Sequence, residues 1–525
     1  MTRQKRILIV GCRFDEDRAG GARPWRWPQA MAPVFLAGAC NRDTCDVRVY
    51  SELYSGPLTD QRLLAWPDML VLTGLQVDFD RYLHLTAYAR TLNPGVVVVA
   101  GGSIVELAPA FARRFFDYCC TGPVDELSSV VADAFGEDYA AAPVMPRYEL
   151  AYWSRLIGAV ESSRNCNFRC TFCTMSIGSI GSIGSIGSIR HRDYQNLAPG
   201  SVQNEILRCA RKHIFFLDNN FFGNDSRAFD AKLSMLRSLH SDGRLHDWSA
   251  EVTADFFARG ENLDKAREAG CSALFCGVES MDPSTLHAFD KKQNTVCDTP
   301  EMMRSCLEKG IVFLYGLIFD PTTRTEASIE SELDHLLDQP ALPLPGYFTL
   351  PIPLLGTPYF FESLEDRRIL PRTRVRDLEG VTLCLQPLEG IESFSRWWPD
   401  FLRLRRRRLR ALWHEARLQW EYRSSLGNWH RLISLGSLFG LCLPKYHRRN
   451  RTFVSTTEVL DPQYQPAFPV DPKFESYFQP TFVTDANGKL CPDLGEVLSL
   501  RRSNNPEEVH EEAPEPSPGA YGRVG

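Results

Sequence analysis

Runs of β-branched and other apolar residues alternate with helix-length segments, and this alternation constrains the fold more than any other feature of the chain. The first runs are RILIVG (6–11), DVRVYS (46–51), DMLVLTG (68–74) and GVVVVAGG (95–102). Nearly continuous apolar character is typical of strands buried on both faces of a parallel sheet. With helical stretches such as 80–92 between them, the runs predict an α/β fold that begins with an open, doubly wound, Rossmann-like domain over residues 1–140.

A second αβ series follows a Pro-containing linker at 140–152. Its strand candidates are LIGAVES (156–162), IFFLDNN (214–220), DWSAEVTA (247–254), SALFCGVES (272–280), IVFLYGLIF (311–319) and GYFTLPIP (346–353). Six such units predict a partial parallel barrel over residues 150–365. Functional residues would lie at the C-terminal ends of its strands.

The pattern changes after about residue 365. Residues 393–422 carry Trp, Arg and Leu at helical spacing, and 429–443 continue as a mostly apolar helix. We expect a mostly helical C-terminal domain over 366–502. Residues 503–525 are acidic and rich in proline, which predicts a disordered tail.

Composition narrows the compartment and the partners. The chain has 525 residues, sixteen cysteines and a formal net charge of -6. Its first residues show no signal-peptide pattern, and the apolar run at 7–10 is far below the roughly 20 residues of a membrane span. We therefore expect a cytoplasmic protein whose cysteines are reduced, and no nucleic-acid partner, because there is no global excess of basic residues.

Three cysteines lie close together in NCNFRCTFC (165–173), directly after the first strand of the second series. Thiolates are the ligands that iron–sulfur clusters prefer, and this spacing lets Cys166, Cys170 and Cys173 hold three irons of a [4Fe–4S] cluster. The fourth iron would be open to the amine and carboxylate of a small molecule, and Phe172 could pack against a bound adenine. A zinc site is the alternative, although zinc normally takes a fourth Cys or His nearby.

The loop NCNFRCTFC resembles the signature of radical S-adenosylmethionine (radical SAM) enzymes. Fragments that resemble later parts of this family follow in order: LDNNF (217–221), GVES (277–280), YGLIFDPTTRT (315–325) and TLPIPLLGTPYF (349–360). The resemblance implies that Asp218 and Asn219 approach the methionine moiety of SAM, where the wider family has Gly-Gly-Glu. It also implies that Glu279 and Ser280 approach the methionine carboxylate or the ribose. A strand-end salt bridge is the alternative for Glu279.

A Rossmann-like domain in front of such a barrel resembles the cobalamin-binding class of this family. The supporting fragments are PVFLAGACN (33–41), GGSIVELAP (101–109) and YCCTGPVDEL (118–127). The resemblance implies a cobalamin between the two domains, with Gly101 and Gly102 near its nucleotide tail. From the residues alone, the Gly-Gly pair also fits a tight turn. The Asp-x-His-x-x-Gly signature of other cobalamin proteins is absent, and His84 has a helical context.

The resemblance implies a cobalamin-dependent enzyme that cleaves SAM to a 5′-deoxyadenosyl radical and methylates an unactivated carbon of a small-molecule or lipid-like substrate. Flavodoxin or ferredoxin would supply electrons. Oxidation or rearrangement by the same cofactors is one alternative. A methylthiotransferase with a second cluster on Cys12, Cys45 and Cys119 or Cys120 is another, and a non-enzymatic cobalamin or iron–sulfur sensor is a third.

Two further segments allow more than one interpretation. The basic run at 401–410 and the apolar stretch at 432–444 fit contact with a membrane surface, or a solvated helix face beside a core helix. The three-residue Ser-Ile-Gly repeat at 176–189 begins three residues after Cys173. It either covers the cluster or is a tolerated insertion.

Overall fold

The structure is a computed structural model. It describes residues 4–13, 31–107, 109–174, 194–339, 341–370, 373, 378–380, 382–403, 405–442, 482–484 and 490–492. The Ser-Ile-Gly repeat, the acidic tail and most of the chain after residue 442 lie outside the described residues.

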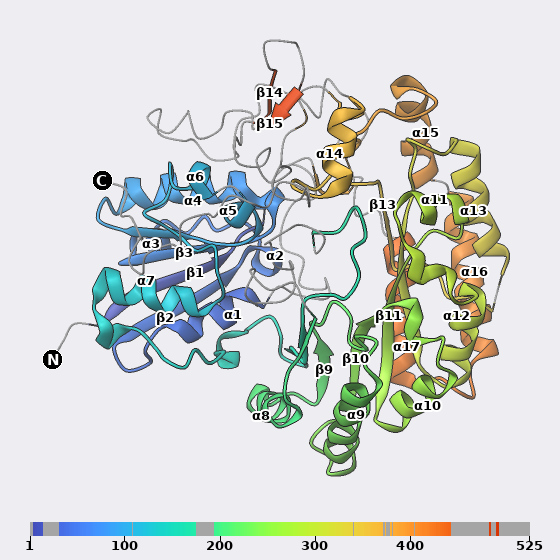
Figure 1. The fold of residues 1–525 in the computed structure, drawn as a ribbon, viewed down its shortest axis with the longest axis horizontal. Coiled ribbons are helices and arrows are strands. Elements are labelled where there is room, and N and C mark those ends of the chain that lie inside the picture. Colours follow the sequence, from blue (N-terminus) through green and yellow to red (C-terminus); the bar gives the residue numbers. More distant parts are fainter. Residues whose placement is uncertain are drawn as a thin grey trace, which may run out of the picture.

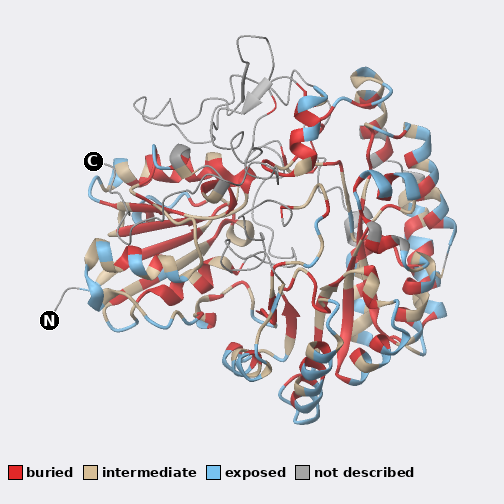
Figure 2. Cartoon of the chain, in the orientation of Figure 1, coloured by how far each residue is buried: buried red, intermediate tan, exposed pale blue. Residues whose placement is uncertain are grey.

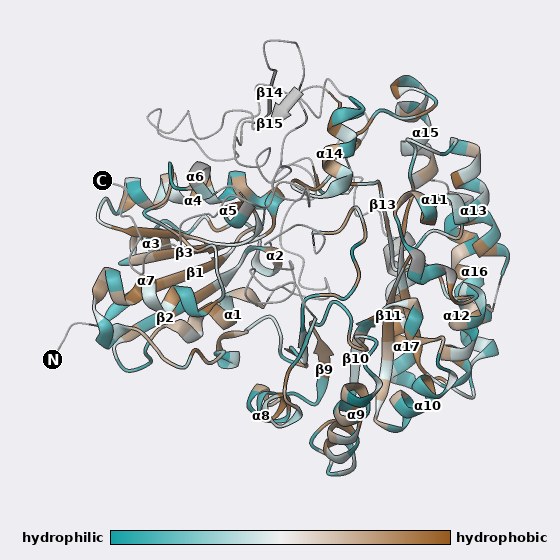
Figure 3. Ribbon diagram, in the orientation of Figure 1, coloured by the Kyte–Doolittle hydropathy of each residue, from teal (hydrophilic) through white to brown (hydrophobic). Residues whose placement is uncertain are grey.

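The N-terminal sheet is fully parallel and has the strand order β2-β1-β3-β4-β5. Its strands are β1 (Lys5–Gly11), β2 (Cys45–Ser51), β3 (Met69–Thr73), β4 (Val97–Ala100) and β5 (Tyr118–Cys119). This order reverses direction between β1 and β3, which makes the sheet doubly wound. The predicted Rossmann-like fold is confirmed, because the apolar runs of the sequence are the central strands of this sheet (Figure 3).

Helices cover both faces of this sheet (Figure 1). They are α1 (Ala32–Leu36), α2 (Glu52–Ser55), α3 (Gln61–Ala65), α4 (Phe79–Leu92), α5 (Ser103–Leu107), α6 (Pro109–Ala112) and α7 (Asp125–Phe135). Because side chains alternate along a strand, Leu8 and Val10 of β1 pack in one core with α4, whereas Ile7 and Ile9 pack in another with α7. Figure 2 shows the strands buried and the outer helix faces exposed.

The second sheet is a parallel half-barrel whose strands neighbour one another in chain order. They are β6 (Ile157–Val160), β9 (His213–Phe216), β10 (Asp247–Val252), β11 (Cys271–Glu279), β12 (Val312–Ile318) and β13 (Tyr347–Thr349). The intervening helices are α8 (Pro199–Cys209), α9 (Ser226–Ser241), α10 (Gly260–Glu268), α11 (Pro283–Ala288), α12 (Thr299–Glu308) and α13 (Glu326–Asp338). Each of the six predicted strands is present, so the partial barrel is confirmed.

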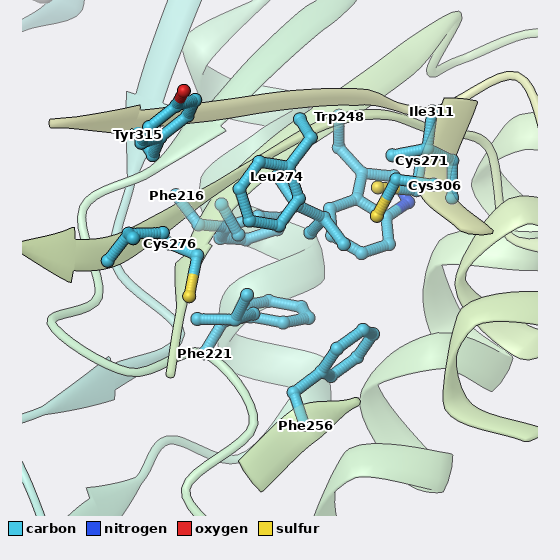
Figure 4. Close-up of a cluster of buried hydrophobic side chains, with 14 of the residues drawn as sticks. Phe216, Phe221, Trp248, Phe256, Cys271, Leu274, Cys276, Cys306, Ile311 and Tyr315 are labelled. Carbon is cyan, nitrogen blue, oxygen red and sulfur yellow. The ribbon is translucent and has the colours of Figure 1, made fainter. Parts of the chain in front are cut away.

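A dense aromatic core joins the outer face of the half-barrel to its helices (Figure 4). Trp248 of β10 is fully buried there and donates a hydrogen bond from Nε1 to the carbonyl oxygen of Ala269, 2.8 Å away. The polar end of the indole is thus satisfied inside an otherwise apolar layer. This core fixes the strands whose C-terminal ends form the site.

The helical region predicted after the half-barrel is present and contains α15 (Ile391–Arg403), α16 (Arg405–Glu421) and α17 (Asn428–Cys442). Phe394 and Trp398 of α15 belong to the barrel core. Ile433 of α17 packs with Val312 and Leu314 at the start of β12. Phe313, between these two residues, points into the outer core instead. Because side chains alternate along a strand, Val312 and Leu314 point to the concave face, and α17 covers this face at the N-terminal end of β12. The helical region is therefore continuous with the barrel, and the domain limits of 366 and 502 stay predictions.

Further described elements are α14 (Pro358–Glu365) and a short antiparallel pair, β14 (Phe482–Thr484) with β15 (Leu490–Pro492). Helix α14 joins the two sheets, because Phe360 and Leu364 lie in the same core as Leu72 of β3. No helix among the described residues is long and apolar enough to cross a membrane.

Candidate active site at the C-terminal ends of the half-barrel strands

The cysteine loop follows β6, at the C-terminal end of the first barrel strand. The short strands β7 (Ser163–Arg164) and β8 (Gln195–Asn196) pair antiparallel and close the base of the segment between them. Within the loop, the amide of Cys173 donates to the carbonyl of Cys170 at 3.0 Å. The loop therefore turns tightly between its second and third cysteines.

The three thiols suit an iron–sulfur cluster. Cys170 is buried, and Cys166 and Cys173 are half-buried. Burial raises the pKa of the Cys166 thiol to about 11, so a thiolate there needs a positive partner such as a metal. No three His, Cys, Asp or Glu side chains of the described residues meet around one metal ion. Thiolates that bind different irons of one cluster need not meet in that way.

Asp218 follows β9 and fastens the start of this loop. Its carboxylate is fully buried and accepts hydrogen bonds from the amide of Ser162 at 2.7 Å and the hydroxyl of Ser163 at 2.7 Å. Nζ of Lys232, itself buried, lies 3.7 Å away. Every contact of this carboxylate is thus internal. Its predicted approach to SAM stays a prediction, and the described contacts make it a positioning residue.

The two asparagines after Asp218 face the loop differently. Asn220 donates from Nδ2 to Oδ1 of Asn167 at 2.7 Å, which adds a second link to the cysteine loop. Asn219 is half-buried, and its Nδ2 has no hydrogen-bond partner among the described residues. Asn219 is therefore the member of LDNNF that has a donor to offer to a ligand.

Glu279 ends β11 in a conformation that few side chains adopt. Its φ is 63°, and the register with β12 shifts at this point. Its carboxylate pairs with Lys291, which is 6% exposed. Burial lowers the pKa of Lys291, but Glu279 and the nearby Cys170 thiol raise it by more, so the lysine remains charged. The strand-end salt bridge that the sequence allowed for Glu279 is present.

Glycine at position 277 makes room for this pair. A Cβ at Gly277 would lie 2.6 Å from Oε1 of Glu279 and 2.7 Å from Nζ of Lys291. Ser280, in contrast, is 1% exposed and donates its hydroxyl to Glu332 at 2.9 Å, beside Arg324. Of the predicted Glu279–Ser280 pair, Glu279 has a charged side chain that is partly exposed, whereas Ser280 is buried. The ligand contact of Ser280 stays a prediction.

Sequence reasoning missed two lumen residues. The carboxylate of Glu251, near the end of β10, has no hydrogen-bond partner among the described residues. Burial raises the pKa of this carboxyl to about 7, with Asp218 and Glu279 adding to the shift and Lys291 opposing it. Tyr347 of β13 stacks on Phe275 of β11, with ring centroids 5.9 Å apart and planes 7° apart. Alternation along the strands places such residues in the lumen, but a strand pattern alone does not show which of them lack partners.

Phe172 contacts protein on two sides. Its ring lies edge-on to Phe289 with 5.2 Å between centroids, and Nζ of Lys291 is 5.5 Å from the ring. The next contact of the loop is the amide of Tyr359, which donates to the carbonyl of Thr171 at 3.1 Å. The predicted contact of Phe172 with adenine stays a prediction.

The two glycines after β4 differ in backbone conformation and in the space around them. Gly102 has φ +96°, and a Cβ there would lie 2.7 Å from the carbonyl oxygen of Gly74, at the end of β3. A Cβ at Gly101 would make only ordinary contact with Cys120. The pair brings the β3 and β4 loops together at the carboxyl edge of the sheet, where doubly wound folds bind ligands. His84 is fully buried in α4.

Cys45 and Cys12 lie at opposite ends of the N-terminal sheet. Strand pairing sets Cys45 opposite Lys5 at the start of β1, whereas Cys12 follows the end of β1. A strand of this length separates them by roughly 20 Å. Cys45 therefore cannot share a cluster with Cys12, and the ligand set expected for the methylthiotransferase alternative is wrong in including Cys45.

The middle of the chain is similar to a known protein family. Residues 160–332 match the Radical SAM superfamily. The hopanoid C-2 methylase of Rhodopseudomonas palustris (strain TIE-1) is 25% identical over 333 residues, which are 59% of this chain and 60% of that protein. The bacteriochlorophyllide d C-12(1)-methyltransferase of Chlorobaculum tepidum is 31% identical over 121 residues, 23% of this chain and 26% of that protein. The chain thus spans less than two thirds of either relative.

Two solved structures share the fold. The cobalamin-dependent S-adenosylmethionine radical enzyme OxsB, with aqua-cobalamin bound, superposes with a TM-score of 0.54 at 15% identity, over 82% of this chain and 75% of that one. The radical S-adenosylmethionine methyltransferase TsrM from Kitasatospora setae, with cobalamin and a [4Fe–4S] cluster, gives 0.51 at 17% identity, over 70% and 76%. At these identities the likeness concerns the fold.

Proposed function

We propose that the protein is a cobalamin-dependent radical SAM enzyme that methylates an unactivated carbon, a proposal supported by the match of residues 160–332 to the Radical SAM superfamily. One observation carries the proposal. The three-cysteine loop ends the first strand of a half-barrel and is joined, through a single turn, to a doubly wound sheet of the kind that binds cofactors at its carboxyl edge.

That turn is the segment 350–357, between β13 and α14. On one side, the amide of Leu355 donates to Oε1 of Gln76, which precedes α4 in the N-terminal domain, at 3.2 Å. On the other side, Tyr359, near the start of α14, contacts the cysteine loop through Thr171. A cofactor at the carboxyl edge of the N-terminal sheet would therefore be close to whatever the cysteine loop holds.

Each residue of the site has a distinct task in this proposal. Cys166, Cys170 and Cys173 would hold the cluster. Asp218 keeps the start of their loop in place, and Asn219 and Glu251 offer a donor and a carboxylate to the ligand. With SAM and cobalamin bound, these groups supply a carbon-centred radical and a transferable methyl group, while the protein supplies placement and exclusion of water.

Anaerobic reconstitution tests the proposal. We expect the protein, given iron, sulfide and cobalamin and then desalted, to retain about four irons and a cobalamin spectrum. After reduction with dithionite, or with flavodoxin as the proposed physiological donor, it should release 5′-deoxyadenosine from SAM. A filled cluster without SAM cleavage would contradict the enzyme assignment. Loss of cobalamin on desalting, with SAM cleavage retained, would contradict the methyl-transfer assignment alone.

We further propose a lipid-like substrate, approached at a membrane surface. The outer face of α16 carries a stripe of exposed apolar residues at helical spacing, here called the α16 stripe: Leu409, Leu412, Trp413 and Trp420, with exposures of 60, 49, 68 and 70%. Arg423 lies over the ring of Trp420, 4.5 Å from its centroid. Exposed Trp and Leu beside Arg are typical of helices that lie in the interface of anionic bilayers.

The basic run itself has a different task. Arg407 and Arg410 form ion pairs with Glu330, Asp334 and Asp338 of α13, at 2.7–3.1 Å for the shortest contacts. These arginines hold α16 against the barrel. The interface that the run suggested therefore falls on the opposite, outward face of the helix, where the stripe lies.

Flotation with phosphatidylglycerol-containing vesicles tests the surface. The wild-type protein should float with the vesicles, and the double variant Trp413→Ser/Trp420→Ser should remain in the dense fraction. Leu156→Ser removes an exposed apolar side chain of similar accessibility, 70%, outside the stripe and should leave flotation unchanged. Equal flotation of the double variant, or a concentration-dependent dimer that the double variant abolishes, would contradict the membrane proposal.

A further inference from the structure

A short polar segment between α11 and α12 ties the end of β11 to the cysteine loop. This segment, here called the 291–294 bridge, contains three residues that are buried despite their polar side chains: Lys291 is 6%, Gln293 5% and Asn294 6% exposed. Buried polar groups persist where partners satisfy them. The partners of these three side chains are therefore informative.

Two of the three anchor the bridge to β11. Asn294 donates from Nδ2 to the carbonyls of Gly277 and Val278, at 2.8 and 2.9 Å. Lys291 pairs with Glu279 on the same strand. The bridge is thus held in place without any contribution from Gln293.

Gln293 makes the contact to the cysteine loop. Its Nε2 donates to Sγ of Cys170, 3.2 Å away, across 123 positions of sequence. Cys170 is 8% exposed, so water has little access to this contact. In such a low-dielectric place a hydrogen bond to a charged group is strengthened.

We propose that Gln293 sets the reduction potential of the cluster by hydrogen bonding to the Cys170 thiolate. The inference rests on the proposed function, since it needs the cluster. A one-electron reduction adds negative charge to the cluster and its sulfurs, and an N–H donor stabilises the more negative state. Hydrogen bonds to ligand sulfurs are one of the means by which proteins tune such potentials. Gln293 acts through its contact with Cys170 and is therefore a tuning residue.

Two variants separate tuning from packing. Gln293→Glu keeps the size of the side chain, replaces the donor with an acceptor and adds a negative charge. Gln293→Leu removes the donor and leaves an apolar side chain of similar length. In EPR-monitored redox titration of the reconstituted, SAM-free protein, both should shift the midpoint to lower potential, with Glu shifting it further. Iron content should remain near that of the wild type.

A matched control is available in the same barrel. Asn262 is 2% exposed and donates from Nδ2 to the carbonyl of Phe256 at 2.9 Å, so Asn262→Leu also removes a buried amide donor. It should lower thermal stability and leave the midpoint unchanged. An equal midpoint in wild type and both Gln293 variants would overturn the inference.

The wild-type protein offers a test that does not depend on how the variants fold. Glutamine labelled with nitrogen-15 at the side-chain amide should give a resolved hyperfine coupling to the reduced cluster in pulsed EPR. Absence of this coupling would overturn the inference. Failure of the wild type to take up any cluster would instead contradict the proposed function, so the two failures are distinguishable.

Discussion

The carboxylate of Asp218 accepts a hydrogen bond of 2.7 Å from the backbone amide of Ser162, which lies 56 positions earlier in the chain. This contact ties the end of β9 to the end of β6, where the cysteine loop begins. The contact therefore fixes the position at which the cysteine loop leaves the sheet.

Asp218→Ala should therefore destabilise the protein and weaken cluster retention. The change leaves the donors of Ser162 and Ser163 without their acceptor and leaves buried Lys232 without a counter-ion. Breaking a buried charge pair from one side costs about 3 to 5 kcal/mol. Thermal unfolding and iron analysis measure both effects. The melting temperature of Asp218→Asn, which retains one acceptor oxygen, should fall between those of the wild type and Asp218→Ala. A wild-type melting temperature for Asp218→Ala would contradict the anchoring role of this carboxylate.

Each of Cys166→Ala, Cys170→Ala and Cys173→Ala should abolish the cluster absorbance and SAM cleavage, because each thiolate would hold its own iron. Cys297→Ala is the matched control, since Cys297 is a half-buried cysteine outside the loop whose Sγ donates to the carbonyl of Ala254. It should retain both properties. Full cleavage in any of the three loop variants would remove the assignment.

Glu251 should make stability fall with pH in the protein without SAM. Burial raises its pKa to about 7, above its ordinary value of 4.5. The folded state thus holds this proton more tightly than the unfolded state, and the free energy of unfolding decreases as pH rises from about 4.5 to 7. The decrease is about 3 kcal/mol at most.

Glu251→Gln should remove this decrease. Melting temperatures of the variant and the wild type should agree near pH 4.5, and the variant should be the more stable of the two at pH 8. A wild-type melting curve that rises between pH 5 and 7 in parallel with the variant would count against a neutral Glu251.

Alanine substitutions should affect Gly101 and Gly102 differently. Gly102→Ala combines an unfavourable φ with a clash against Gly74, so it should cost about 2 kcal/mol or more and reduce cobalamin retention. Gly136→Ala isolates the first effect, because Gly136 has φ +107° and nothing within 4 Å. Gly101→Ala should be tolerated. Denaturant titration and cobalamin retention after desalting measure these differences, and equal losses at positions 101 and 102 would contradict the geometry.

Much of the fold could be predicted from local pattern. Parallel buried strands leave a nearly continuous apolar signature, and each predicted run of the second series became a barrel strand. The cysteine loop was equally visible, because its three ligands are close in sequence. Patterns of this kind depend on neighbours within about one element of the chain.

What could not be predicted depends on distant partners. The sequence does not show that the carboxylate of Asp218 accepts hydrogen bonds from Ser162 and Ser163. It also does not show that Gln293 donates to a cysteine 123 positions away. The role of the basic run could not be predicted either. Whether Arg407 and Arg410 face solvent or acidic side chains depends on which helix lies beside them, and that helix is α13. Burial of a polar residue is a tertiary property that composition does not encode.

The turn 350–357 has a thermodynamic consequence for cofactor binding. It contacts the N-terminal domain through Leu355 and Gln76 and adjoins the contact of Tyr359 with the cysteine loop. If one arrangement of this turn favours a ligand in either domain, linkage requires that the two ligands raise each other's affinity by the same factor. The order in which the cofactors are loaded then changes the route of assembly and leaves the final stability of the complete enzyme unchanged.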